Sequence, residues 1–538
     1  MTPPPDRPSR RMPLLLGLVA AAAAVVTVGS VLTRASPIAY GGDRPNFVVL
    51  DIDSLRYDHV GATRQHGSVT PTLDALAARG ARFTHAYSQS GWTMPALVSH
   101  LTGALPVVIA AADGQVSWRP AHARDLPEIL GLYGYTTAAF WGSTIPGTMS
   151  SAMGLTFGTV SMHPNAELLA QPPTHEVVDF LKGAPKEPFF AYVHDIDLHH
   201  PLSYRTRDGR VPFDRASTPT DLPNYQRIHA AVAATAGEEA ARDAVLARYD
   251  GVLHLYDNAV GRILAALDNA GLAERTVVVV TSDHGEDFYE HALAEHGLLY
   301  DTTLHVPLIV YDPVATPVTI DTIVQSVDLA PTLLARAGIP VDATMDGHSL
   351  LPLLGGPGEP YPERAVFSLS EACHVSLRTR THKLVLRDLR PQEGRMWHAV
   401  GGANGVVVTL AAFAAAHPLD DAPLADCSAM KRPADGGTTA QVGPSPDELA
   451  IELYDLVADP GEHTNLVAAQ PDKAAEMLVP LLTTLADRRA ALVDAPREVM
   501  TPAQIQALKD NGYWGLVHPG AAAGEAAPVP PGTAPAAR

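Results

Sequence analysis

The stretch from Val277 to Asp287 constrains the fold of this chain more than any other. It opens with four consecutive valines, Val277–Val280, and then turns polar. Such a run of β-branched residues predicts a strand that is buried on both faces. Because ligands of open α/β sheets bind outside the carboxyl ends of the strands, Asp283 and His284 are candidates for a metal or catalytic site. The alternative is a helix N-cap aspartate beside a surface histidine.

A second apolar strand is predicted at Phe47–Leu50, and it also runs into carboxylates. Alternate residues of a strand share a face, so Asp51 and Asp53 are expected on the same side. A carboxylate at a strand end suits a hard divalent cation. A solvated loop carboxylate is the alternative for Asp51 and for Asp58.

A hydroxyl group is expected at the start of a short helix that ends at Gly103. Thr93 is the predicted N-cap of this helix, and Pro95 lies in its first turn. The positive end of the helix dipole and the free backbone N–H groups favour an anion there. An oxygen nucleophile that attacks phosphate or sulfate would be useful at this position, although an ordinary threonine cap is the alternative.

Other segments are read as scaffold. A helix is predicted at residues 71–79, with Thr70 as N-cap and Gly80 as the stop. An amphipathic helix is predicted at Tyr249–Leu267, and the histidines His100, His254 and His291 are interpreted as packed or surface residues. Two further strands are expected at Thr381–Leu386 and Ile451–Leu456. The long insertion between them, residues 387–450, contains a strand-like stretch at 406–410.

The overall charge excludes one class of partner. The 538 residues carry 58 acidic and 38 basic side chains, which gives a formal net charge of −20. Nucleic acid would be repelled, whereas a small phosphorylated or sulfated substrate depends on local groups and stays compatible. The two cysteines, Cys373 and Cys427, allow at most one disulfide.

The N-terminus is predicted to be a targeting segment. Arg7, Arg10 and Arg11 precede an uncharged run from Met12 to Leu32, which is long enough to span a bilayer. This charge order places the body outside the cytoplasm, in the periplasm, in the cell envelope or secreted. Residues 1–42 act either as a single transmembrane anchor or as a cleaved signal, and loosely match a twin-arginine signal.

The order of the motifs resembles the sulfatase-like branch of the alkaline phosphatase superfamily, from about residue 44 to 516. The blocks that carry this resemblance are Asp53–Gly61, Thr70–Ser90, Trp92–Gly103, Phe189–Pro201, Thr281–Asp287, His296–Ile309, Val327–Leu334, Glu452–Pro460 and Leu508–Tyr513. It implies an α/β fold, with a mostly parallel mixed sheet between helices and a smaller C-terminal α+β subdomain. The expected division is a catalytic domain at 43–355, the subdomain at 356–516 and a disordered tail at 517–538.

The resemblance also implies roles for single residues. The metal ligands it implies are Asp53, Thr93, Asp283 and His284, with Thr93 as the nucleophile. It places three histidines and two other side chains at the substrate: His199 and His296 in catalysis, and His194, Asp197 and Arg56 in substrate binding.

Three departures from the family pattern point away from formylglycine chemistry. Thr93 stands where the family has a cysteine or serine that is oxidised to an aldehyde, and a threonine would give a ketone. Leu97 replaces the arginine that supports the aldehyde hydrate, and Ser54 replaces the second aspartate of the metal pair. The remaining set resembles the single-metal sites of lipoteichoic-acid synthases and phosphoethanolamine transferases, and one site of nucleotide phosphodiesterases.

This set predicts one divalent cation. An imidazole beside oxygen ligands favours Mn²⁺ or Zn²⁺, with Ca²⁺ or Mg²⁺ also compatible. A second metal, held by Asp197, His199 and His296 or by Asp195 with His199, is the less favoured variant.

The predicted function is that of an exported, metal-dependent hydrolase or transferase of phosphate or sulfate esters. The substrate would be a small-molecule, lipid-linked or glycan-linked anionic ester. One alternative is a sulfatase proper, which hydrolyses sulfate esters. An alternative of another class is a catalytically inactive ligand-binding module on the same fold.

Overall fold

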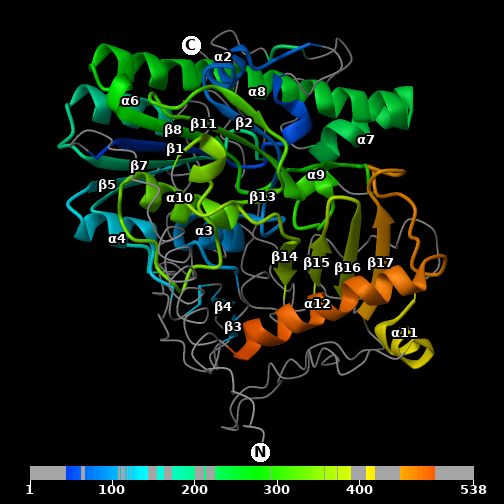
Figure 1. Cartoon of the computed structure of the whole chain (residues 1–538). Helices are drawn as coiled ribbons and strands as arrows, with labels where there is room; N and C mark the ends of the chain where they lie inside the picture. The colour runs from blue at the N-terminus through cyan, green and yellow to red at the C-terminus, as the bar shows by residue number, and fades with distance from the viewer. Residues whose placement is uncertain are drawn as a thin grey trace, which may run out of the picture.

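The computed structural model describes a body built on a large sheet and a second, smaller sheet (Figure 1). The described residues are 44–61, 67–106, 109–110, 116–117, 119–120, 123–142, 154–162, 172–199, 211–213, 225–291, 294–356, 358–371, 374–388, 408–417 and 449–490. The predicted N-terminal segment, both cysteines and the predicted C-terminal tail lie outside these residues. No helix in the described part of the chain is long and apolar enough to cross a bilayer.

The body is built on a nine-stranded sheet in the order β12-β2-β11-β8-β1-β7-β5-β6, with β13 also paired to β2. Its strands are β1 (Asn46–Ile52), β2 (Ala81–Tyr87), β5 (Thr136–Trp141), β6 (Thr159–Met162), β7 (Phe189–Asp195), β8 (Thr276–Thr281), β11 (His305–Tyr311), β12 (Val318–Ile320) and β13 (Val324–Gln325). Only β11 runs antiparallel to its neighbours, so the sheet is mixed and mostly parallel, as predicted.

Helices cover both faces of this sheet (Figure 1). One layer contains α2 (Pro71–Arg79), α6 (Pro172–Lys182), α7 (Tyr225–Ala236) and α8 (Glu238–Asn269), and the other contains α3 (Thr93–Thr102), α4 (Leu126–Leu132) and α10 (Leu329–Arg336). Alternate residues of β1 enter the two layers: Val48 and Leu50 pack against the first, and Phe47 and Val49 against the second. Two cores therefore share one central strand.

The predicted strands and helices are largely confirmed. The valine run lies in β8, and every residue of β8 is buried, as is every residue of β1. The helix predicted at 249–267 is part of α8, which begins earlier, at Glu238. α2 starts at Pro71 as expected, but Thr70 makes no side-chain cap bond and Gly80 is extended rather than left-handed.

A second sheet stands beside the body, with antiparallel order β14-β15-β16-β17. Its elements are β14 (Val366–Glu371), β15 (His374–Arg378), β16 (His382–Asp388), β17 (Leu449–Asp455), α11 (Leu410–Ala416) and α12 (Pro471–Ala490). Two of the four strands were predicted. The strand-like stretch at 406–410 is wrong at Leu410, which begins α11. The predicted domain boundaries stay predictions.

The shorter elements connect these layers. They are β3 (Ile109–Ala110), β4 (Val116–Ser117), β9 (Asp287–Phe288), β10 (Ala294–Glu295) and α9 (Asp301–Leu304), with 3-10 turns η1 (Tyr57–His59), η4 (Ala273–Arg275), η5 (Ser326–Asp328) and η6 (Leu351–Leu354).

A buried lysine joins the second sheet to the body. Lys383 of β16 is fully buried, and its ammonium lies 2.5 Å from Asp301, 2.7 Å from Glu462 and 3.1 Å from the carbonyl oxygen of Leu299. Arg378 of β15 also pairs with Asp301, at 3.0 Å. Two carboxylates and one carbonyl oxygen therefore surround the ammonium, so this buried charge is paired instead of isolated.

We expect Lys383→Met to destabilise the protein by about 3–5 kcal/mol, because it leaves the buried carboxylate of Glu462 without its cation and leaves Asp301 paired with Arg378 alone. Urea denaturation measures this change. Arg380→Met is the control: Arg380 is 41% exposed and its pair with Glu363 should contribute no more than about 1 kcal/mol. Equal losses in the two variants would contradict this view of Lys383.

Candidate active site

The carboxyl ends of β8, β1 and β7 bring the predicted ligands together. The strands run in parallel register, with Asp51 opposite both Thr281 and His194. The next residues of each strand are therefore adjacent, and the amide of Asp53 donates to the carbonyl of Asp195 at 2.9 Å. Ser282, which follows β8, also contacts the end of β1, because its hydroxyl donates to the carbonyl of Ile52 at 2.6 Å.

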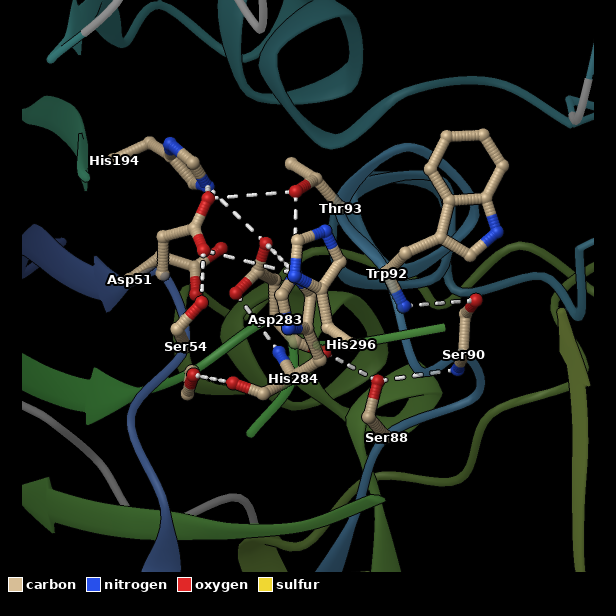
Figure 2. Close-up of polar contacts among 12 residues, drawn as sticks. Asp51, Ser54, Ser88, Ser90, Trp92, Thr93, His194, Asp283, His284 and His296 are labelled. Carbon is tan, nitrogen blue, oxygen red and sulfur yellow. Dashed lines mark hydrogen bonds and ion pairs between the residues drawn. The ribbon is translucent and has the colours of Figure 1, made fainter. Parts of the chain in front are cut away.

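Three of the predicted metal ligands, Asp53, Asp283 and His284, lie together as a group that could hold a metal ion, and Figure 2 shows Asp283 and His284 side by side. Nε2 of His284 lies 3.6 Å from Oδ1 of Asp53 and 3.5 Å from Oδ2 of Asp283. All three side chains are buried. Within the described ranges no second group of this kind occurs, so the variant with a second metal at Asp197, His199 and His296 gains no support.

Thr93 joins this group from helix α3. Its Oγ1 lies 3.2 Å from Nε2 of His284 (Figure 2). The same oxygen lies 3.4 Å from Oδ2 of Asp53. The predicted N-cap role is wrong by one residue: Trp92 is the N-cap, in an extended conformation, and Thr93 is the first helical residue. Thr93 is partly exposed, whereas the three ligands behind it are buried, so the hydroxyl faces the open side of the group.

The donor set fits a divalent cation. Nδ1 of His284 lies 2.8 Å from the carbonyl of Gly285, which requires the proton on Nδ1 and leaves the Nε2 lone pair facing the carboxylates. Ligands that share one cation at ~2.1 Å in a tetrahedron lie about 3.4 Å apart, close to the separations here. A larger octahedral shell gives similar separations, so the imidazole, and not the spacing, favours Mn²⁺ or Zn²⁺.

His194 lies against the ligands instead of standing apart at the substrate. Its Nε2 is 3.4 Å from Oδ2 of Asp283 and 3.8 Å from Oδ2 of Asp53. Burial alone would lower its pKa, but the hydrogen bond and charge of Asp283 outweigh burial and raise the pKa to about 9. His194 therefore balances the carboxylates as a cation, and its predicted contact with substrate stays a prediction.

His296 and His199 extend the group outward. The His296 ring stacks on His284 with centroids 4.7 Å apart, and the His199 ring lies 4.9 Å from that of His296. Burial and the neighbouring His284 lower the pKa of His296 to about 3. His199 is partly exposed, so the three imidazoles lead from the buried ligands to the surface.

Glu286 is a site residue to which sequence reasoning assigned no role. Its Oε2 lies 3.4 Å from Nδ1 of His296 and 3.5 Å from the Ser54 hydroxyl. Burial raises the pKa of Glu286 to about 8. Ser54, in turn, donates to Oδ1 of Asp53 at 2.8 Å and has a left-handed φ of 63°. This strained residue links Glu286 to the first ligand.

Asp197, which follows β7, is buried, with 6% of the residue exposed. Its amide donates to Oδ1 of Asp195 at 2.9 Å, and burial together with the Asp195 charge raises the pKa of Asp197. Its predicted role in substrate binding stays a prediction.

Arg56 is held by charged neighbours, and its predicted role in substrate binding stays a prediction. Its guanidinium forms ion pairs with Asp58 and Glu290 and donates to the carbonyl of Glu286 at 3.0 Å. Only 5% of the residue is exposed. These contacts stabilise the turn after His284. They favour a structural role for Arg56 over direct contact with substrate. Asp58 itself is exposed, as its alternative interpretation held.

A buried network below the site was also missed. Asp51 is fully buried, which contradicts a solvated loop residue, and its Oδ2 lies 3.0 Å from Nδ1 of His100. The Tyr192 hydroxyl donates to the same oxygen. His100 belongs to α3, so this contact anchors the Thr93 helix to β1. His100, His254 and His291 are packed residues, as predicted.

Comparison with known proteins places the chain in a family. A sequence profile described as Sulfatase matches residues 45–339, more than half of the 538 residues. The chain belongs to the sulfatase family. It is 26% identical to human (Homo sapiens) arylsulfatase A over 466 residues, which cover 67% of this chain and 84% of that protein.

Solved structures show the same fold. A phosphonate monoester hydrolase of Agrobacterium radiobacter matches with a TM-score of 0.56 and 21% identity, over 84% of this chain and 96% of that chain. BT1596, a 2-O GAG sulfatase, matches with a TM-score of 0.58 and 21% identity, over 84% and 95%. These structures confirm the sulfatase-like fold, and the family match confirms the hydrolase class.

We expect metal affinity to rise with pH near neutrality. Although burial opposes protonation of His284, Asp283 and Asp53 raise its pKa, so at lower pH a proton competes with the cation for Nε2. Each proton released on binding improves the affinity by up to about tenfold per pH unit below that pKa. Calorimetric titration of the metal-free protein with Mn²⁺ measures the affinity. Repeating it in two buffers of different ionisation enthalpy measures the number of protons released on binding.

His254→Gln is the control for this titration, because His254 contacts the carbonyl of Val69 away from the site and should leave the proton release unchanged. Binding with no proton release between about pH 6 and pH 8 would contradict a protonated ligand set.

Proposed function

We propose that this sulfatase-family hydrolase cleaves phosphate or phosphonate esters with Thr93 as its nucleophile. The position of the Thr93 hydroxyl carries the proposal: Oγ1 lies 3.2 Å from Nε2 of His284 and 3.4 Å from Oδ2 of Asp53, at the N-terminus of α3 and on the open side of the ligand group. A hydroxyl so placed can attack a tetrahedral centre whose oxygens face the same ligands.

The chain supplies the ligands of a divalent cation through Asp53, Asp283 and His284. When bound there, the cation would lower the pKa of the Thr93 hydroxyl and offset the negative charge of the ester. The buried carboxylates are held by the ends of β1 and β8, so the ligand group is preorganised by the sheet.

The proposed reaction has two displacement steps. Thr93 Oγ1 loses its proton to solvent on the open side of the group and forms a bond to phosphorus, the bond from phosphorus to the leaving oxygen breaks, and the leaving oxygen takes a proton from the enzyme. Water then attacks the phosphothreonine, which releases the phosphate or phosphonate and restores the hydroxyl. An acceptor alcohol in place of water would make the same chemistry a transfer.

His199 is the favoured proton donor. His296 has a pKa of about 3 and is therefore neutral at pH 7, so it is a poor acid there, although it can still donate a hydrogen bond from its ring. His199 lies beyond it on the exposed side, with ring centroids 4.9 Å apart. In this proposal His296 orients the leaving group, and His199 donates the proton to it.

Threonine chemistry favours phosphorus over sulfur. A hydrated aldehyde can expel a bound sulfate by collapse of its second hydroxyl, and a threonine ester has no such hydroxyl. A sulfate or phosphate ester of Thr93 can therefore be cleaved only by attack of water on its sulfur or phosphorus atom. The family match nevertheless supports sulfate esters as the second candidate, because arylsulfatase A is similar over 67% of this chain.

We expect Thr93→Ala to lower kcat by at least about a thousandfold, because a nucleophile is lost. The full chain, loaded in turn with Mn²⁺, Zn²⁺ or Ca²⁺, would be assayed with nitrophenyl phosphate, phosphate diester, phosphonate and sulfate. Ser99→Ala removes a hydroxyl of the same helix that bonds to Pro95 instead, and should keep its activity. Undiminished turnover by Thr93→Ala would refute the nucleophile, and Thr93-dependent turnover of the sulfate ester alone would favour the second candidate.

We propose further that the enzyme acts outside the cytoplasm, on the strength of the basic cluster and apolar run at residues 7–32. Fractionation of cells should place the chain in the envelope or secreted fraction, and removal of residues 7–32 should leave it in the cytoplasm. Resistance to alkaline extraction would show an anchor, and release would show a cleaved signal. Cytoplasmic full-length chain would refute export.

A further inference from the structure

Strand β14 of the second sheet lies along the segment that leads to Thr93. The amide of Leu369 donates to the carbonyl of Gln89 at 2.8 Å, and the Ser368 hydroxyl donates to the carbonyl of Ser88 at 2.8 Å. The next residue, Ser370, accepts a hydrogen bond from the indole N–H of Trp92, also at 2.8 Å. The residue before the nucleophile is thus attached to a different sheet.

The same Ser370 also holds the backbone next to His296. Its hydroxyl donates to the carbonyl of Gly297 at 2.7 Å, and the residue is fully buried. One side chain and its own carbonyl therefore contact the chain neighbours of both Thr93 and His296.

The two active-site segments also meet directly. The amide of Gly297 donates to the carbonyl of Gly91 at 2.5 Å. A Cβ on Gly91 would lie 2.1 Å from the carbonyl oxygen of Leu298, so this approach requires glycine. With the two bonds of Ser370, it closes a ring that joins the segment 91–92 to the segment 297–298.

We infer that Ser370 is a positioning residue of the reaction, which sets His296 opposite Thr93. The inference rests on the proposed function, in which these two side chains act on the same ester. Ser370 does not touch the reacting atoms. It acts through Trp92 and Gly297, and so makes the second sheet part of the catalytic apparatus.

The fold should survive the loss of this hydroxyl. The segment after His296 is fixed a second time at Asp301, which pairs with Lys383 and Arg378 of the second sheet. Without the Ser370 hydroxyl the carbonyl of Gly297 loses its buried donor, while the attachment at Asp301 stays. The expected result is a folded protein in which His296 is displaced, and misplacement by ~1 Å can lower a rate about a hundredfold.

We expect Ser370→Ala to lower kcat by about 10- to 100-fold while KM changes by less than about threefold. The loss should be larger for an alkyl phosphoester than for a nitrophenyl one, because His296 and His199 serve the leaving oxygen and a poor leaving group needs them more. Both constants would be measured on the full chain loaded with Mn²⁺. Ser370→Cys keeps the volume with a weaker donor and should lie between the wild type and the alanine variant.

Ser368→Ala is the matched control. It removes a hydroxyl of the same strand that also donates to a backbone carbonyl at 2.8 Å, that of Ser88, and it should keep kcat within about threefold. Equal losses of kcat in Ser368→Ala and Ser370→Ala would overturn the inference, as would an unchanged kcat in Ser370→Ala.

Hydrogen exchange gives a reading that does not depend on turnover. The Gly297 amide should exchange faster in Ser370→Ala, and in Ser370→Cys if the alanine variant does not fold, but at the wild-type rate in Ser368→Ala. Unchanged exchange would refute the positioning role even if no substrate were turned over. Retained activity of Thr93→Ala would instead refute the proposed nucleophile, so the two failures are distinguishable.

Discussion

The parallel register of β1 with β8 and β7 is the constraint on which the site depends. Because Asp51 lies opposite Thr281 and His194, the residues that follow each strand emerge at one edge of the sheet. This geometry forces Asp53 and Asp283 together in a buried place. Carboxylates so close repel each other unless a positive charge lies between or beside them. Without a metal, the His194 imidazole, with its pKa raised to about 9, supplies such a charge, and a divalent cation would supply it more strongly.

The sheet and the ligand group were accessible from sequence because both depend on short-range pattern. A run of four valines and the apolar run Phe47–Leu50 specify two buried strands, and the polar residues after them fall at the ligand-binding edge by a general rule of α/β sheets. The offset of Thr93 by one position was not accessible. Trp92 takes the extended cap conformation, with its amide 3.3 Å from the Ser90 hydroxyl, and an N-cap preference alone does not foresee this.

The contacts that sequence reasoning missed join residues far apart in the chain. Arg56 pairs with Glu290, which lies 234 positions away, so this contact could not be expected from the local sequence. Ser370 and Trp92 are separated by 278 positions, and the bond between them exists only because β14 packs beside the nucleophile segment. Lys383 looks like an ordinary strand lysine until the fold surrounds it with Asp301 and Glu462. No local periodicity encodes such pairs.

The substitution at Ser54 changes the charge of the site and bears on its substrate. With serine in place of the second aspartate, the ligands Asp53 and Asp283 carry two negative charges and His284 is neutral when it binds a metal. A divalent cation would make this group neutral overall, where a further carboxylate would leave it negative. Glu286 does not restore that charge at pH 7, because burial raises its pKa to about 8. A neutral group attracts a dianion more strongly than a negative group would, which supports the proposed phosphate monoesters over singly charged sulfate esters.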